Sequence, residues 1–270
     1  FCWSLLSDEN LFLHLQHENP QASLQCSNRG SFFLSLHMSA LFPKKYNSPE
    51  ELVALLVQRG LAIDDINIAS QYIRNIGYYR LSAYLYPLLD MPKEKQQFKS
   101  NSHFNKALEL YRFDKKLRLF LFNEIEKIEV SFRSNLANMV AEETGNMFWI
   151  TDSSLFANTS KYNKTLELID KELKGSKEDF ILHFKHKYSN PYPPAWMLVE
   201  ILPIGVVTRI FENIKSNALK KKIAARYELP VPVLTSWLTV MTLTRNSCCH
   251  HSRVWNRIYA VTPMIAKKLS

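Results

Sequence analysis

The chain has 270 residues, of which 46% are apolar and 22% charged, and this balance fits a protein that buries one large core. It has only 6 glycines, too few for the many tight turns of a β-sandwich or barrel, so long helices are favoured. The formal net charge of +9 indicates either a solvated basic surface or a polyanionic partner, most simply nucleic acid.

Membrane and secretory patterns are missing from the sequence. No uninterrupted apolar stretch approaches the roughly 18 residues that a spanning helix needs. Asp8 and Glu9 stand where a secretory signal would carry positive charge, and the 4 cysteines, two of them adjacent, form no disulfide framework. We therefore expect a cytoplasmic protein that has no membrane partner.

The first 37 residues differ from the rest in charge. They contain no lysine, one arginine and three acids, a net charge of −2, which leaves +11 for residues 38–270. Their apolar pattern follows neither helix nor strand for long. We interpret residues 1–37 as an upstream, poorly ordered extension, with Met38 close to the natural start and one helical domain over residues 38–270.

Helical signals begin shortly after Met38. Ser48 is a natural N-cap, Pro49 suits the first helical position, and Glu51 completes a capping box. Gly60 is placed to end this helix.

The longest apolar pattern runs from about Phe104 to Glu143, with spacings of three and four residues that follow one side of a helix. A loop is expected over 145–160, and Pro203 predicts a kink in the helix that contains it. The remaining predicted helices cover 64–75, 78–89, 161–174, 177–187, 195–214, 216–227 and 231–258. No strand pattern of comparable length occurs, so the sequence predicts an all-α fold.

The stretch 244-TRNSCCHHSRVWNR-257 concentrates residue types that carry chemistry. Consecutive helical residues project about 100° apart, so the adjacent cysteines and histidines cannot jointly bind one metal ion. The cysteines also lack the C-x-x-C spacing of a redox pair. A metal centre and a redox centre are both disfavoured, and we expect no cofactor.

A different set of residues, polar and basic ones, lies on one face of the helix if this stretch is helical. Asn246, His250, Arg253 and Arg257 fall at i, i+4, i+7 and i+11, which predicts a single polar and basic stripe. This is either a solvated basic face or a surface that binds phosphate and transfers a proton. Arg245 lies about 140° round the helix from His250. It must therefore bend round or act with a second copy of the site.

This combination suits chemistry on a phosphodiester. Arginine neutralises a phosphate and the charge of its transition state, and histidine moves a proton at neutral pH. In RNA the 2′-OH is a nucleophile already in place, so cleavage needs no metal and leaves a 2′,3′-cyclic phosphate. DNA lacks this group and would not react.

The motif Arg245-Asn246-x-x-x-His250 resembles the R-x4–6-H motif of HEPN-domain ribonucleases. The wider sequence resembles the Abi (AbiD/AbiF-like) family of bacterial abortive-infection proteins over about residues 46–258. Six segments carry this resemblance in the family's order: 59-RGLAI-63, 76-IGYYRLSAYLYP-87, 110-LYRFDKKLR-118, 124-EIEKIEVSFRSNLA-137, 193-PPAWMLVEILPIG-205 and 245-RNSCCHHSRVWNR-257. The family commonly has alanine where Cys249 stands, a mild departure.

The resemblance implies a HEPN-type helical bundle with toxin-like ribonuclease activity in phage defence, and two motifs brought together in a homodimer. It implies that Arg245 binds phosphate, that Asn246 assists, and that His250 is the general acid and base. His251 gives R-x5-H and is the alternative base. The family pattern also includes Arg253, Trp255 and Asn256, and their role is either in the site or in holding the helix in place.

Other residues are weaker candidates. RNA contacts are predicted for Arg253, Arg257, Arg80, Lys115, Lys116 and Arg118. The aromatic residues near Arg80 also suit a buried core. The charged run that contains Lys115, Lys116 and Arg118 also includes Asp114, which can pair with one of these cations. Glu126, Glu129 and Arg133 would support Arg245 or His250, or form a structural ion pair.

The alternatives to an enzyme are a non-catalytic RNA-binding or regulatory module and a structural dimerisation protein. A regulatory RNA or antitoxin is a possible further partner of a toxin.

Overall fold

The computed structural model describes residues 45–265, so the prediction for residues 1–37 and Met38 lies outside the described residues. Within 45–265 the chain forms ten α-helices and no strand, which confirms the all-α prediction. The helices are α2 (Pro49–Gln58), α3 (Ile66–Ile76), α4 (Tyr78–Leu85), α5 (Phe104–Thr144), α6 (Thr159–Gly175), α7 (Asp179–Lys187), α8 (Ala195–Ile201), α9 (Ile204–Asn213), α10 (Asn217–Ala225) and α11 (Val231–Cys249). Short 3-10 turns occur at Tyr86–Leu88, Lys93–Lys95, Trp149–Thr151 and Ser153–Leu155.

Helix α2 begins with the predicted capping box. The Ser48 hydroxyl accepts a hydrogen bond from the Glu51 N–H at 3.2 Å, and the Glu51 carboxylate accepts one from the Ser48 N–H at 2.6 Å. Both contacts satisfy N–H groups that the first helical turn leaves without a partner. Gly60, two residues after the last helical residue, has φ of +90°, a conformation that glycine adopts without strain.

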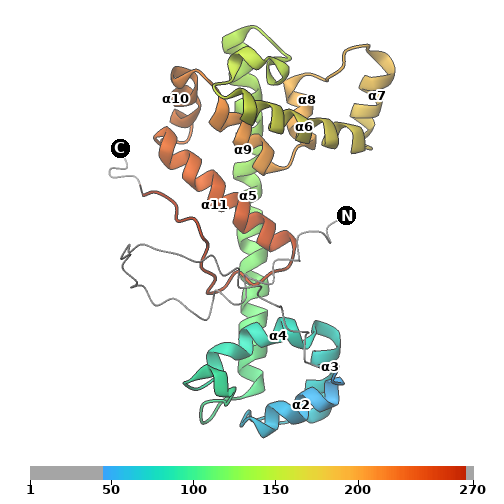
Figure 1. Cartoon of the computed structure of the whole chain (residues 1–270), viewed down its shortest axis with the longest axis vertical. Coiled ribbons are helices and arrows are strands. Elements are labelled where there is room, and N and C mark those ends of the chain that lie inside the picture. The colour runs from blue at the N-terminus through green and yellow to red at the C-terminus, as the bar shows by residue number, and fades with distance from the viewer. Residues whose placement is uncertain (1–44, 266–270) are drawn as a thin grey trace, which may run out of the picture. The chain divides into compact units, whose positions relative to one another are not determined.

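Helix α5 organises the fold, because its 41 residues extend over about 60 Å and take part in two separate cores. Its first turns, including Phe104, Ala107 and Leu108, pack with α2, α3 and α4 in what we call the N-terminal core. Its last turns pack with helices α6 to α11 in the C-terminal core. Figure 1 shows α5 in green, with α4 at its first turns and α11 lying across its middle.

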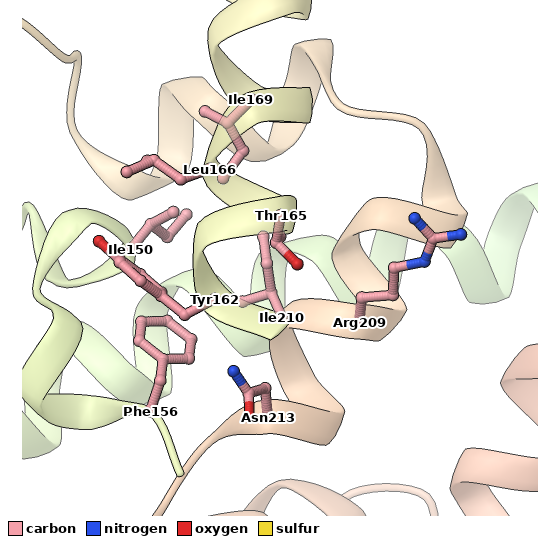
Figure 2. A pocket seen from close by; sticks show the side chains of 9 residues that line it. All are labelled: Ile150, Phe156, Tyr162, Thr165, Leu166, Ile169, Arg209, Ile210 and Asn213. Atoms are coloured by element: carbon pink, nitrogen blue, oxygen red, sulfur yellow. The ribbon is translucent and has the colours of Figure 1, made fainter. Parts of the chain in front are cut away.

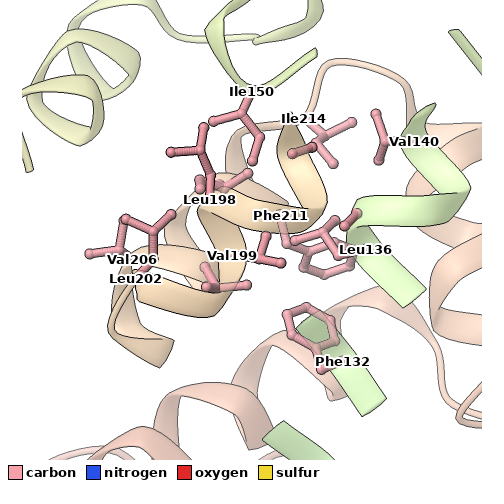
Figure 3. Close-up of a cluster of buried hydrophobic side chains, with 14 of the residues drawn as sticks. Phe132, Leu136, Val140, Ile150, Leu198, Val199, Leu202, Val206, Phe211 and Ile214 are labelled. Carbon is pink, nitrogen blue, oxygen red and sulfur yellow. The ribbon is translucent and has the colours of Figure 1, made fainter. Parts of the chain in front are cut away.

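The C-terminal core is dense in aromatic and branched side chains (Figure 3). The Phe132 and Phe211 rings meet edge to face with centroids 5.5 Å apart. Trp149 is fully buried, and its indole N–H donates to the Ala137 carbonyl at 3.2 Å. Each aromatic side chain of this size removes a large apolar area from water, so this core fixes how α5 meets α8 and α9.

Pro203 breaks a helix more completely than predicted. Instead of one kinked helix over 195–214, the chain forms α8 and α9 as separate helices. Proline lacks an N–H and disfavours helical geometry at the residue before it, and Leu202 accordingly takes an extended conformation.

Helix α11 ends at Cys249, so the predicted extension of this helix to residue 258 is wrong. His251 takes the left-handed conformation, with φ of +54°, that ends the helix. Two hydrogen bonds complete a Schellman motif: His251 N–H to the Cys248 carbonyl at 3.1 Å and Ser252 N–H to the Ser247 carbonyl at 2.9 Å. Glycine is the usual residue at this position, and histidine is among the few others that adopt it.

The end of α11 also corrects the predicted stripe. Asn246 lies in the last helical turns and His250 at the C-cap, so these two keep helical spacing. Arg253 and Arg257 lie beyond the helix and are not aligned with them by helical geometry.

Candidate functional site

The chain that follows the motif is anchored by a buried carboxylate on α5. Asp114 is 0% exposed, and its Oδ1 accepts from the N–H groups of Val254 at 3.1 Å and Trp255 at 2.6 Å. Its Oδ2 accepts from the Tyr84 hydroxyl at 2.6 Å and from the Arg118 guanidinium. We call these contacts the Asp114 network. The network fixes where the main chain goes after the two histidines.

Arg118 is therefore not the surface residue that we predicted for RNA. Its side chain is buried, ion-paired with Asp114, and its Nη1 lies 3.5 Å from the Ser252 carbonyl. The one helical turn between Asp114 and Arg118 lets the two charges pair on the inner side of α5. Burial and the nearby Asp114 carboxylate raise the pKa of Tyr84 to about 12, so this hydroxyl remains a hydrogen-bond donor.

Three further contacts hold the end of the motif against the N-terminal helices. The Arg80 guanidinium donates to the His251 carbonyl, and Arg253 Nη1 donates to the Ala83 carbonyl at 3.2 Å. Trp255 packs against the N-terminal core. For Arg253 and Trp255 the contacts match the supporting role that was one of two sequence-based interpretations.

A second carboxylate on α5 lies close to the motif arginine. Glu129 accepts a hydrogen bond from Arg133, which is buried and also donates to the Val199 carbonyl and, at 2.6 Å, to the Leu202 carbonyl. These carbonyls are at the end of α8, where a cation satisfies groups that the helix leaves unpaired. Arg133 therefore joins α5 to α8.

Arg245 approaches the other oxygen of Glu129. Its Nε lies 3.5 Å from Glu129 Oε2, close enough for an ion pair, but this buried Nε makes no hydrogen bond. The Arg245 side chain is 34% exposed, against 12% for Glu129. The Nε of the guanidinium thus faces a nearly buried carboxylate, while about a third of the Arg245 side chain is exposed to solvent. Glu126, one turn before Glu129, is exposed.

The other motif residues are at the surface. Asn246, His250 and His251 are all exposed, and the His250 N–H continues the helical pattern by bonding the Asn246 carbonyl at 3.0 Å. His250 follows Arg245 by five positions, which places them about 140° apart round the axis and about 7.5 Å apart along it. One chain therefore presents the two groups in different directions.

Additional basic groups are exposed on nearby segments. Lys115 and Lys116 are exposed on α5, and Arg257 is exposed with its guanidinium 5.3 Å from the centre of the Tyr259 ring. Asn256 is exposed, with φ of +51°. These positions remain predictions for RNA contact or support.

The adjacent cysteines have different environments. Cys248 is buried, and this burial raises the pKa of its thiol, whereas Cys249 is partly exposed. Within residues 45–265 no three His, Cys, Asp or Glu side chains lie close enough together to hold a metal ion.

Two hollows lie outside this region. One, between α6 and α9, is lined by Phe156, Ile210 and other mainly apolar side chains and has no room for a water molecule (Figure 2). The other, of about 210 Å³, lies beside Val140. Val140 follows Glu129 by eleven residues, about 16 Å along α5. The cluster around Arg245 thus stands apart from both hollows.

Comparison with known proteins gives one clear result. A family model described as Abi-like protein matches residues 71–256, which include α4, α5 and the whole motif. The chain belongs to this family. Membership indicates a role in abortive infection, a form of phage defence. No curated protein and no solved structure matches the chain.

None of the helices within residues 45–265 is long and apolar enough to cross a membrane.

Sequence reasoning missed Tyr84 and the anchoring role of Asp114. A signal was present, because Asp114 is an acid inside a basic run and has an arginine four residues later. That spacing predicts an ion pair, but it does not show that the carboxylate also receives two N–H groups from residues 140 positions further on.

Proposed function

We propose that the protein is a metal-independent endoribonuclease whose site combines residues from two copies of the chain. The RNA 2′-oxygen attacks the adjacent phosphorus, forming a 2′-O–P bond while the P–O5′ bond breaks. A histidine of the motif accepts the 2′-OH proton, and a second motif histidine donates a proton to the leaving 5′-oxygen. The products are a 2′,3′-cyclic phosphate and a 5′-OH.

The observation that carries this proposal is the state of Arg245. Two other arginines near the site, Arg118 and Arg133, are buried and donate to carboxylates and main-chain carbonyls. Arg245 instead keeps a side chain that is 34% exposed, and its nearest charged group is the Glu129 carboxylate, 3.5 Å from its Nε. An arginine oriented by one carboxylate and left open to solvent is ready to bind a phosphate.

The histidines supply the second part of the argument. His250 and His251 are exposed and follow Arg245 within six residues, so neither is sequestered as a core side chain. Because Arg245 and His250 project in different directions, a second copy gives the simplest way to place both on one phosphodiester. Asn246 would assist by binding a phosphate oxygen.

The proposal is tested by incubating labelled RNA with the protein in EDTA and analysing the product ends. We expect cleavage by the wild-type chain with cyclic phosphate ends, and a rate at least about 100-fold lower for Arg245→Ala. His250→Ala and His251→Ala, compared side by side, identify the proton-transferring histidine. Arg209→Ala and His183→Ala alter exposed residues on α9 and α7 and serve as matched controls.

Three results would contradict the proposal. Cleavage that persists in Arg245→Ala and in both histidine variants excludes this site. RNA binding without cleavage over varied substrates favours the non-catalytic RNA-binding module. Cleavage that EDTA abolishes shows that a metal ion takes part.

A further inference from the structure

An exposed aromatic ring and an exposed carboxylate lie on α5 shortly before Glu129. Phe122 is a large apolar side chain that is nevertheless 36% exposed, and Glu126, four residues later, is exposed as well. Side chains four residues apart are neighbours on a helix, with Cβ atoms about 5–6 Å apart. Within residues 45–265 the Glu126 carboxylate makes no hydrogen bond or ion pair, whereas Glu129 has two arginines beside it. The pair therefore offers an aromatic surface and a free acceptor to a ligand.

This pair lies close to the motif arginine along α5. Phe122 precedes Glu129 by seven residues, which places the two within about 20° of each other round the axis and about 10 Å apart along it. Glu126 precedes Glu129 by three residues, about 4.5 Å along the axis. Because Arg245 Nε lies 3.5 Å from Glu129, an RNA strand whose phosphate binds Arg245 brings an adjacent base within reach of Phe122 and Glu126.

Helix α11 and the chain after it run antiparallel to this part of α5. Arg245 meets Glu129, whereas the carbonyl of Ser252, seven residues later, lies 3.5 Å from Arg118, eleven residues earlier on α5. The motif residues that follow Arg245 therefore lie beside the turns of α5 that precede Glu129. The pair and the motif are thus at the same level of the helix.

The pair and the motif also share one side of the crossing between α5 and α11. On α5, Arg133 bonds the end of α8, and Glu126 precedes it by seven residues, nearly two full turns. On α11, Thr242 lies against α9, since a Cβ added to Gly205 would be 3.4 Å from the Thr242 methyl group, and Asn246 follows Thr242 by four residues. Because α8 and α9 adjoin each other in the chain, Glu126 and Asn246 lie on the same side of the two helices.

We propose that Phe122 and Glu126 form a base-binding subsite of the ribonuclease and that this subsite selects guanine. The base next to the scissile phosphate stacks on the Phe122 ring, as bases of single-stranded RNA do on exposed aromatic side chains. The Glu126 carboxylate accepts two hydrogen bonds from the edge of the same base. This inference rests on the proposed function in that Arg245 binds the phosphate of the same strand.

The free carboxylate determines which base is selected. Guanine presents its N1–H and its N2 amino group side by side, two donors that match the two oxygens of a carboxylate. Adenine and cytosine each present one amino group beside a ring nitrogen that only accepts, and uracil presents its single N–H between two carbonyl oxygens. An acid repels the phosphates of the strand, so Glu126 favours binding only where a base supplies donors to it. Guanine supplies the most.

Oligonucleotides that cannot be cleaved test the subsite independently of catalysis. The probe is a labelled 2′-fluoro hexamer, UUGUUU, which lacks the 2′-OH nucleophile, and fluorescence anisotropy at one fixed salt concentration measures its dissociation constant. We expect the wild-type chain to bind this hexamer about 10-fold more tightly than the same hexamer with inosine, which lacks the N2 amino group, in place of guanine. Uracil at that position should weaken binding at least as much.

Variants separate the two roles. Glu126→Ala should bind the guanine and inosine hexamers within about 2-fold of each other, because the acceptor of the N2 amino group is gone. Phe122→Ala should weaken the binding of every hexamer about 10-fold, and Phe122→Tyr, which keeps a ring, should restore it. Glu167→Ala and Phe180→Ala, at exposed positions on α6 and α7, are the matched controls and should bind as the wild type does. Circular dichroism confirms that each variant is folded.

The outcomes distinguish the subsite from the ribonuclease proposal. No binding, or equal affinity of the wild type for the guanine, inosine and uracil hexamers, overturns the inference, as does a guanine preference that persists in Glu126→Ala. A guanine preference without cleavage of natural RNA supports the subsite and refutes the ribonuclease proposal. Cleavage of natural RNA at sites that show no enrichment of guanine refutes the subsite and leaves the ribonuclease proposal intact.

Discussion

Two carboxylates of α5, Asp114 and Glu129, occupy similar settings but differ in what they hold. Each pairs with an arginine four residues later, Arg118 for Asp114 and Arg133 for Glu129, and all four side chains are buried or nearly so. Asp114 receives two further main-chain N–H groups and is closed to solvent. Glu129 instead reaches Arg245, whose side chain remains 34% exposed.

The difference separates a structural anchor from a candidate site on one helix. In the Asp114 network the side-chain partners Tyr84 and Arg118 are buried, and the two main-chain N–H donors belong to partly buried residues, so these contacts position the chain after His251. Around Glu129, Arg133 is held by hydrogen bonds to the carboxylate and to two main-chain carbonyls, whereas Arg245 keeps N–H donors for a ligand. Buried groups with all partners satisfied stabilise a fold, whereas an incompletely bonded, oriented cation is typical of a binding site. Ranked by loss of stability, the following changes test this distinction.

The largest loss is expected for Asp114→Ala. Removal of the carboxylate leaves Arg118 as an uncompensated buried charge and two N–H groups without an acceptor, so the free energy of unfolding should fall by about 3–5 kcal/mol. Urea unfolding followed by circular dichroism measures this. Asp179→Ala, at an exposed position, should cost under about 1 kcal/mol. Equal losses in the two variants would mean that the network is not an anchor.

A smaller loss is expected for Glu129→Ala, about 1–3 kcal/mol. Arg133 keeps its two carbonyl partners on α8 when the carboxylate is removed, so its charge is not left without any contact. Cleavage of RNA should fall as well, because Arg245 loses the group that orients it. Glu167→Ala, at an exposed position on α6, is the matched control. An unaltered cleavage rate in Glu129→Ala would refute the orienting role.

Arg245→Ala should change the free energy of unfolding by less than about 1 kcal/mol. Its Nε makes no hydrogen bond in the folded chain, and about a third of the side chain is exposed to solvent. The same variant should nevertheless lose RNA cleavage. A loss of stability as large as that of Asp114→Ala would place Arg245 among the structural arginines and count against the site.

The smallest effect concerns the adjacent cysteines. Burial and a raised pKa keep the Cys248 thiol protonated, so iodoacetamide should alkylate it more slowly than Cys249 at pH 8. Mass spectrometry of the peptide that contains both residues measures the two rates. Faster modification of Cys248 would show that the end of α11 opens in solution.

Much of the fold follows from local sequence rules. The capping box at Ser48 and the apolar periodicity of α5 depend on neighbours within a few residues, and both are found in the structure. The end of α11 does not follow from such rules, because no glycine or proline marks it and His251 takes the left-handed position instead. Arg118 was misplaced for a related reason, since its inward direction depends on Asp114 and on chain more than 130 residues away.

The candidate site shows the same division. The motif spacing indicates Arg245 and His250, and the i, i+4 spacing indicates the pair of Glu129 with Arg133. That Glu129 also lies 3.5 Å from Arg245 depends on how α11 crosses α5, which short-range patterns do not specify.

The central claim is that Arg245 of one copy acts with the histidine of another, and a mixed dimer tests it most directly. Arg245→Ala and His250→Ala chains carrying different tags are co-expressed, the mixed dimer is purified through both tags, and RNA cleavage is measured in EDTA. One of the two composite sites then keeps both groups, so we expect about half of the wild-type rate, while each pure variant is inactive. A mixed dimer as inactive as the pure variants would contradict a site shared between two copies.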